Sequence, residues 1–142
     1  MKKTTKILLR LVVLSLFACS ASGEKLSTSN STQVSSIVIE RVNIAGTDEE
    51  LRMMLVDFTP AYSNVAHLHP ADGLCYLING DAESEYEGED KKVLHAGDSF
   101  RDQANKEHLL FRNISNTEGL KFICTAKIKK DLQYLQPLPR AS

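Results

Sequence analysis

After residue 36 the chain consists of short segments rich in β-branched and aromatic residues, separated by turn-forming residues. Several segments alternate apolar and polar side chains, which is the period of a half-buried strand. Glycine, asparagine, aspartate and proline at the breaks favour tight turns. We predict strands at 37–44, 51–58, 66–69, 74–79, 92–95, 108–114 and 120–128. Because no long helical period occurs in this region, we predict a single all-β domain, a sandwich or a small barrel.

The first residues of the chain are typical of an export signal. Residues 1–18 carry four basic residues followed by an apolar run that is too short to span a bilayer by itself. The run ends in Leu-Phe-Ala-Cys, which resembles a bacterial lipobox and implies that Cys19 is lipid-modified. Ser20 then favours sorting to the outer membrane, facing the periplasm. An ordinary cleaved signal peptide that contains a cysteine is the alternative.

The remaining chain divides by composition into three parts. Residues 19–36 are rich in serine and threonine and are expected to form a flexible tether behind the lipidated cysteine. We expect the folded domain to span 37–130, and 131–142 to be a C-terminal extension that lies against the domain or trails free.

The charge balance restricts the partners. Loss of residues 1–18 would remove four basic residues and no acidic one, and would change the formal net charge from -1 to -5. An acidic chain without a basic patch argues against a nucleic-acid partner. Anionic lipid headgroups would also repel it, so we expect membrane association to depend on the lipid anchor.

Three histidines are the candidate metal ligands. His67 and His69 are one residue apart in a predicted strand, so both side chains point to the same face and can reach one ion. His108, in a later predicted strand, could complete the set. Imidazole-rich sites suit iron, zinc, copper or nickel, whereas magnesium and calcium prefer carboxylates. The alternative is that the three histidines belong to a barrel that holds no metal.

Two segments resemble the sequence motifs of the cupin superfamily: HLHPADGLCYLINGDAE and HAGDSFRDQANKEHLLFRN. The resemblance covers roughly residues 58–125. It implies a small jelly-roll barrel that holds a divalent metal through His67, His69 and His108. Members of the superfamily are often dimers, so the resemblance also allows a homodimer.

The sequence departs from these motifs at several positions. The motifs place glycines where this chain has Ala61 and Asn105, and a metal-binding glutamate where it has Gly73. The loss of that glutamate predicts a vacant ligand position and a metal held by three neutral imidazoles. Such a site favours iron, zinc, copper or nickel over manganese.

The function expected from these features is binding of a divalent metal by an envelope-anchored cupin, together with a small-molecule ligand or substrate. Some thiol and diketone dioxygenases of the superfamily resemble this site in lacking the glutamate. A three-histidine iron dioxygenase is therefore one alternative, and a metal-free module that binds a small ligand or a protein is another. The sequence names no substrate and does not decide whether the protein is an enzyme.

Two cysteines and one aspartate near the motifs need separate interpretation. Cys75 shares the parity of Gly73 and should point inward, either toward the metal or as a small buried residue. Cys124 should also be interior, and the two could form a disulfide if their Cα atoms lie within about 7 Å. Asp72 is one residue out of phase and is expected in a turn.

Other polar and aromatic residues are expected outside the metal site. We expect His95 to be exposed and Tyr76 to be buried with its hydroxyl hydrogen-bonded. Arg112 either meets a substrate carboxylate or lies on a solvated strand face. The acidic residues between 83 and 90 are interpreted as a solvated sheet edge that discourages strand pairing.

Overall fold

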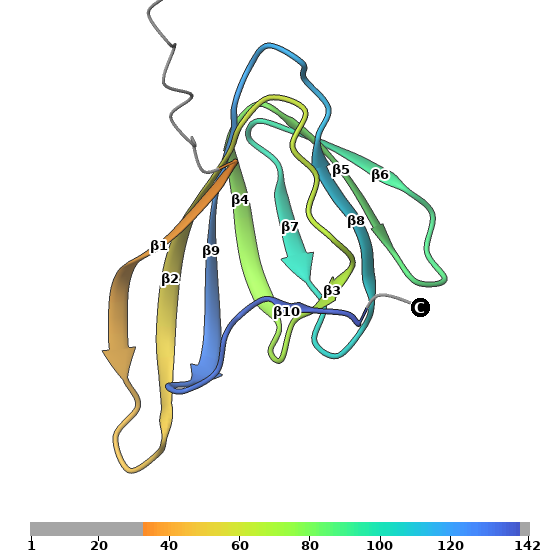
Figure 1. Ribbon diagram of the computed structural model, residues 1–142. Helices are drawn as coiled ribbons and strands as arrows, with labels where there is room; N and C mark the ends of the chain where they lie inside the picture. The colour runs from red at the N-terminus through yellow and green to blue at the C-terminus, as the bar shows by residue number, and fades with distance from the viewer. Residues whose placement is uncertain (1–32, 140–142) are drawn as a thin grey trace, which may run out of the picture. The chain divides into compact units, whose positions relative to one another are not determined.

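The computed structural model describes residues 33–139, which form two five-stranded antiparallel sheets (Figure 1). The first sheet has the order β1 (Val34–Asn43), β2 (Glu49–Phe58), β9 (Leu120–Lys129), β4 (Gly73–Asn79), β7 (Ser99–Asp102). The second has the order β10 (Gln136–Pro137), β3 (His67–Leu68), β8 (His108–Asn113), β5 (Asp81–Tyr86), β6 (Lys92–His95). This architecture confirms the prediction of an all-β jelly roll. Between residues 33 and 139 there is no helix of the length and apolarity needed to cross a membrane.

The core lies between the two sheets and follows from the alternation of the strands. On β9, Phe122 and Cys124 point inward, whereas the residues between and beside them are less buried. Phe58 from β2 packs edge-to-face on Phe111 of β8 and Phe122, with ring centroids 5.8 and 5.5 Å apart. Burying each of these rings contributes about 2 kcal/mol to stability, and the packing holds the two sheets together.

The strands expected from the sequence are present, with shifted ends. The first begins at Val34, so residues 34–36, which we placed in the tether, are part of β1. Three further strands were not predicted: β5, β7 and β10. The acidic stretch from residue 83 is not a sheet edge, because β5 lies between β8 and β6. Its Glu83 accepts a hydrogen bond from Arg112, which holds the acidic side chain on a paired strand.

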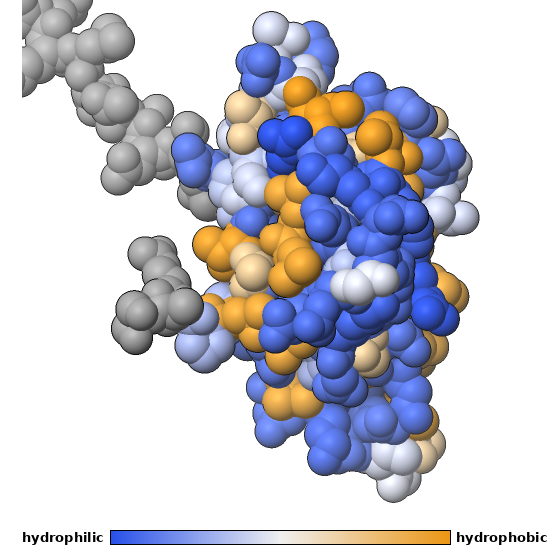
Figure 2. All heavy atoms as spheres, turned by 90° about the vertical axis from the view of Figure 1, so that its right-hand side faces the viewer, coloured by the Kyte–Doolittle hydropathy of each residue, from blue (hydrophilic) through white to orange (hydrophobic). Residues whose placement is uncertain are grey.

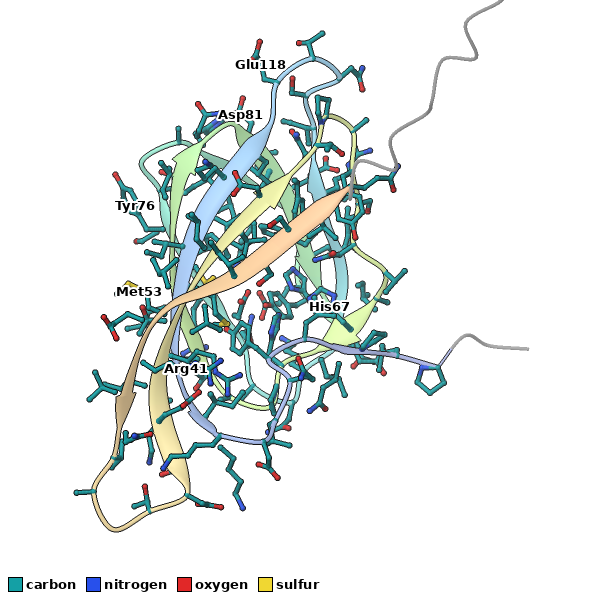
Figure 3. The ribbon with its side chains drawn as sticks, turned by 60° about the vertical axis from the view of Figure 1, so that its left-hand side comes forward. Arg41, Met53, His67, Tyr76, Asp81 and Glu118 are labelled. Carbon is teal, nitrogen blue, oxygen red and sulfur yellow. A yellow bond between two sulfur atoms is a disulfide. The ribbon has the colours of Figure 1, made fainter. Side chains whose placement is uncertain are left out.

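The expectation that Tyr76 is buried is wrong. Its neighbours Cys75 and Leu77 point into the core, and strand alternation therefore turns Tyr76 outward, where it is 49% exposed. Figure 3 shows this side chain pointing away from the interior, on the same outer side as Met53.

Ala61 and Asn105 have the backbone conformation that explains the glycines of the family motifs. Their φ angles are 59° and 56°, in the left-handed region. Asparagine tolerates this region better than most residues, whereas alanine there is strained by its Cβ. The local chain path is therefore compatible with glycine at both positions.

Cys75 and Cys124 form a disulfide inside the barrel. They lie directly opposite each other on β4 and β9, with their Cα atoms 4.1 Å apart. The bond joins residues separated by 49 positions and links two central strands of the first sheet.

The C-terminal segment closes one side of the space between the sheets. It leaves β9 and crosses to the second sheet, where β10 pairs with β3 (Figure 1). The Arg52 guanidinium, paired with Glu50 at 2.7 Å, donates to the carbonyls of Leu132 and Lys130 at 2.9 and 3.2 Å. These bonds hold the start of the segment against β2, so that Tyr134 can enter the interior.

Candidate metal centre

His67, His69 and His108 meet between the two sheets. His67 on β3 is paired directly with His108 on β8, and His69 follows on the same face of the chain. All three rings are buried, and one ring nitrogen from each lies within 4.8 Å of the others. In Figure 3 the His67 ring points into the space between the sheets. The structure thus brings together the three histidines that the sequence singled out.

The hydrogen bonds of His67 and His69 orient their rings. Each Nδ1 donates to a backbone carbonyl, that of Val65 at 2.8 Å and that of Tyr134 at 3.0 Å. In a neutral ring this leaves Nε2 without a proton, and the two Nε2 atoms lie 3.1 Å apart. Two lone pairs this close repel each other unless a cation lies between them. A metal about 2.0–2.2 Å from each nitrogen brings its ligands to about 3.0–3.4 Å from one another, so the pair fits a shared ion.

His108 completes the cluster from the second sheet. Its ring stacks on Tyr86, with centroids 3.9 Å apart and planes inclined by 14°. Nε2 lies 2.9 Å from the Ser84 hydroxyl, and the buried Nδ1 has no hydrogen-bond partner among residues 33–139. Burial lowers the pKa of His108 to about 3 and also lowers the pKa of His67. Both rings are therefore neutral at physiological pH, the form that binds metals.

The ligand position that we expected to be vacant at Gly73 is occupied. A Cβ atom on Gly73 would overlap the hydroxyl of Tyr134, which enters the interior from the C-terminal segment. The expectation of an empty place is wrong because it considered only the two motifs. A side chain far along the chain fills the volume that the missing glutamate would take.

Asp102, a carboxylate beside the histidines, was not predicted from the sequence. Only 5% exposed, it projects from β7 with Oδ2 3.7 Å from His69 Nε2. Tyr134 donates to Oδ2 at 2.9 Å and Tyr86 donates to Oδ1 at 3.3 Å. Burial and the nearby carboxylate raise the pKa of both phenols, so they stay protonated. The sequence offered one signal: Asp102 is two residues from Phe100 in the short segment 99–102, so in a strand both side chains point to the same, inward face.

The remaining candidates lie outside the cluster or beside it. Asp72 accepts a hydrogen bond from the Ala104 amide, as expected of a loop residue. His95 is exposed and contacts Asp81. The disulfide sulfurs of Cys75 and Cys124 lie 3.5 and 3.8 Å from Asp102 Oδ2. The cystine therefore forms part of the wall behind the carboxylate, and neither sulfur is a free thiolate ligand.

A cavity of about 480 Å³ adjoins the three histidines. Its walls are mainly apolar and include Val38, Met54 and Phe100. The basic residue that lines it, Arg52, is already engaged by Glu50 and by backbone carbonyls. The cavity therefore suits a small neutral molecule better than an anion.

Fold and site together define a small jelly-roll barrel with a buried imidazole cluster. The sequence profile of the cupin domain matches residues 54–126, just over half of the chain. The protein therefore belongs to the cupin domain family.

Solved structures with the same fold come from several bacteria. An uncharacterized conserved protein with a double-stranded β-helix domain from Klebsiella pneumoniae superposes with a TM-score of 0.59 at 17% identity, over 78% of this chain and 90% of its own. The DMSP lyase DddQ from Ruegeria pomeroyi superposes with a TM-score of 0.58 at 18% sequence identity, over 78% of this chain and 55% of its own. The polyketide cyclase RemF from Streptomyces resistomycificus superposes with a TM-score of 0.58 at 12% sequence identity, over 78% of this chain and 74% of its own. These likenesses establish the shared fold. No curated protein matches the chain in sequence.

Proposed function

We propose that the protein is a cupin that binds one divalent transition metal through His67, His69 and His108 and a small neutral organic molecule in the adjoining cavity. The observation that supports it best is the pair of Nε2 atoms 3.1 Å apart, on two rings whose Nδ1 atoms each donate to a backbone carbonyl. A bound metal would supply a Lewis acid for an oxygen, nitrogen or sulfur donor of that molecule. Iron, zinc, copper and nickel suit the imidazole ligands.

The chain's own residues would bind and shield the organic ligand. Val38, Met54 and Phe100 line the cavity and offer apolar contacts to the ligand. A volume of about 480 Å³ lies within the range of small-molecule sites. Such a cavity can hold the body of a ligand while one donor group faces the imidazoles.

Metal content tests this function directly. The purified full chain should carry about one transition metal per molecule, measured by elemental analysis, and should rebind it after chelation. A His67→Ala/His69→Ala variant should lose most of the metal, whereas His95→Ala, an exposed histidine, should keep it. Equal metal content in the parent and the double variant would contradict the assignment, and a parent without metal would favour a metal-free binding module.

A three-histidine iron dioxygenase is the second candidate, because Gly73 stands where the family motif places a glutamate. Oxygen consumption by the iron-loaded protein with small thiols and diketones tests it. Consumption that requires all three histidines would support a dioxygenase. Metal binding without oxygen uptake would favour a non-catalytic role.

We further propose that Cys19 carries a lipid that anchors the protein to the outer membrane on its periplasmic side. Cys19 lies outside the described residues, and the support is the lipobox-like sequence. A Cys75–Cys124 disulfide agrees with an oxidising compartment of this kind. Cys19→Ala should abolish lipid labelling and release the protein from the membrane fraction. Membrane recovery of this variant with unchanged lipid labelling would contradict the anchor.

A homodimer is also proposed, through the outer face of the first sheet. On β4 this face exposes Leu74 by 73% and Ile78 by 46%. Contiguous exposed apolar side chains of this kind favour a protein contact.

A further inference from the structure

Asp102 lies directly across from the position where the cupin motif has its carboxylate. In the β4–β7 ladder Gly73 is paired with Asp102, and a Cβ atom on Gly73 would lie 3.4 Å from the Asp102 Cβ. Directly opposed residues in an antiparallel pair point to the same face of the sheet. The carboxylate that is absent from β4 therefore has a counterpart on the neighbouring strand, facing the same interior.

The surroundings of Asp102 contain no lysine or arginine that would compensate a carboxylate charge. It is 5% exposed, and within residues 33–139 no lysine or arginine nitrogen lies within 4.0 Å of it. Its hydrogen bonds come from two phenols, Tyr134 to Oδ2 and Tyr86 to Oδ1. Burying a carboxylate without a cation costs several kcal/mol, and phenol donors offset only part of this. The site lacks a positive charge on one side.

That side faces the histidines. Asp102 Oδ2 lies 3.7 Å from His69 Nε2, the nitrogen that carries no proton when the ring is neutral. Ligand atoms on one transition metal lie about 3.0–3.4 Å apart when they are neighbours, so the separation of Oδ2 from His69 Nε2 exceeds this range only slightly. The carboxylate would have to turn further toward the imidazoles to share an ion with all three, since it does not lie within 4.8 Å of the whole set. A divalent cation would satisfy the Nε2 pair and the carboxylate together.

We propose that Asp102 is the anionic fourth ligand of the metal, in place of the motif's glutamate. This inference rests on the proposed function, because it assumes that the three histidines hold the ion. One carboxylate reduces the formal charge of the centre from +2 to +1. It also adds an oxygen ligand, which widens the choice of metals toward manganese beyond the three-imidazole set. Tyr134 and Tyr86 then position the carboxylate by donating to Oδ2 and Oδ1.

The test compares metal dissociation constants of the full chain and its Asp102→Asn variant. Asparagine keeps the shape of the side chain but removes the charge. We expect zinc to bind at least tenfold more weakly to the variant and manganese to lose more than zinc, measured by competition with a chelating dye. The control is Asp81→Asn, a surface carboxylate that contacts the exposed His95 and belongs to neither the histidine cluster nor the cavity wall, and it should leave both constants unchanged.

The outcomes separate this inference from the proposed function. If the folded Asp102→Asn protein has the same metal dissociation constants as the parent, the inference is overturned and the proposed function stands. This holds even if the metal-free variant melts at a lower temperature, because Asp102 would then contribute to stability and not to metal binding. If the parent binds neither zinc nor manganese, the proposed function fails together with the inference.

A second measurement uses the parent protein and does not depend on the Asp102→Asn variant. With isotope-labelled aspartate, the carboxylate infrared bands of the parent should shift when zinc is added, and the His67→Ala/His69→Ala protein should show no such shift. A zinc-loaded parent with unshifted aspartate bands would overturn the assignment of Asp102.

Discussion

His67 and His108 are buried as neutral imidazoles, and this makes the stability of the metal-free protein depend on pH. Burial lowers the pKa of His67, and it lowers the pKa of His108 to about 3, whereas an unfolded histidine titrates near pH 6.5. Below about pH 6.5 these two rings therefore bind protons in the unfolded chain but stay unprotonated in the folded chain. The contribution of both rings to stability is complete above that pH and is lost progressively below it.

We predict that the free energy of unfolding of the metal-free protein falls as the pH is lowered from 6.5 toward 3. The slope of the free energy of unfolding against pH approaches about 1.4 kcal/mol per pH unit for each ring that is protonated only in the unfolded chain. Denaturant titrations with a chelator present would measure it. His108→Gln should flatten the dependence, whereas His95→Ala should not. A free energy that is constant over this interval would show that the rings accept protons in the folded state.

Ala61 offers a residue-scale test of the backbone. Its φ of 59° strains an alanine by about 1–2 kcal/mol, and a glycine would remove this strain but lose more entropy on folding. We predict that Ala61→Gly raises the free energy of unfolding by up to about 1 kcal/mol without changing metal affinity. Denaturant titration measures the change, and destabilisation by this variant would show that the alanine is unstrained.

Gly73 is also constrained, because a side chain there collides with Tyr134. We predict that Gly73→Glu alone destabilises the protein and that adding Tyr134→Ala restores much of the loss by vacating the volume. Metal affinity should rise in the double variant relative to Tyr134→Ala. Thermal melting and zinc titration measure both effects. Equal stability of Gly73→Glu and the parent would mean that Tyr134 does not occupy this place.

At the scale of elements, the sequence predicted the strands rich in apolar residues and missed the polar strand β5 and the short strands β7 and β10. β9 buries an apolar residue at every second position, so its period is visible in the sequence. On β2 the buried positions alternate too, and Met54 and Phe58 are the apolar ones. β7 has four residues, two of them charged, and β10 has two residues. Such short polar strands form only because a neighbouring strand pairs with them. For this reason Asp102 on β7 and Tyr134 before β10 were not recognised, whereas the three histidines were.

The disulfide between β4 and β9 is the covalent link within the first sheet. A bond that closes a loop of about 50 residues stabilises a protein by about 4 kcal/mol in the chain-entropy account. We predict a loss of this order in the Cys75→Ala/Cys124→Ala variant and a similar loss when the unfolded parent is reduced. Denaturant titrations with and without reductant measure it. The stability of the double variant should not change when reductant is added. If the stability of the parent is also unchanged by reductant, the disulfide is contradicted.

At the scale of the whole barrel, the two sheets present different outer surfaces. The side of the molecule shown in Figure 2 is largely hydrophilic, with apolar side chains confined to a narrower band. On the first sheet the register instead aligns Ile37, Leu55, Ile123 and Tyr76 in one outward-facing row across four strands. Ion pairs Lys121–Asp57 and Lys127–Glu49 lie toward the two ends of the β2–β9 ladder. An apolar centre with a charged rim is the usual composition of a protein interface.

This face determines the last prediction, which concerns the assembly of the protein. Two copies related by a two-fold axis would bring the same apolar row of each copy together, so the contact requires no other partner. Leu74, 73% exposed on this surface, has little packing to lose within its own barrel. We predict that the parent sediments as a dimer and that Leu74→Glu sediments as a monomer with unchanged melting of the metal-free fold. Val93→Glu, an exposed apolar residue on β6 of the other sheet, serves as the matched control and should remain dimeric. A monomeric parent would show that there is no such contact. A dimer that persists in Leu74→Glu but dissociates in Val93→Glu would place the contact on the second sheet.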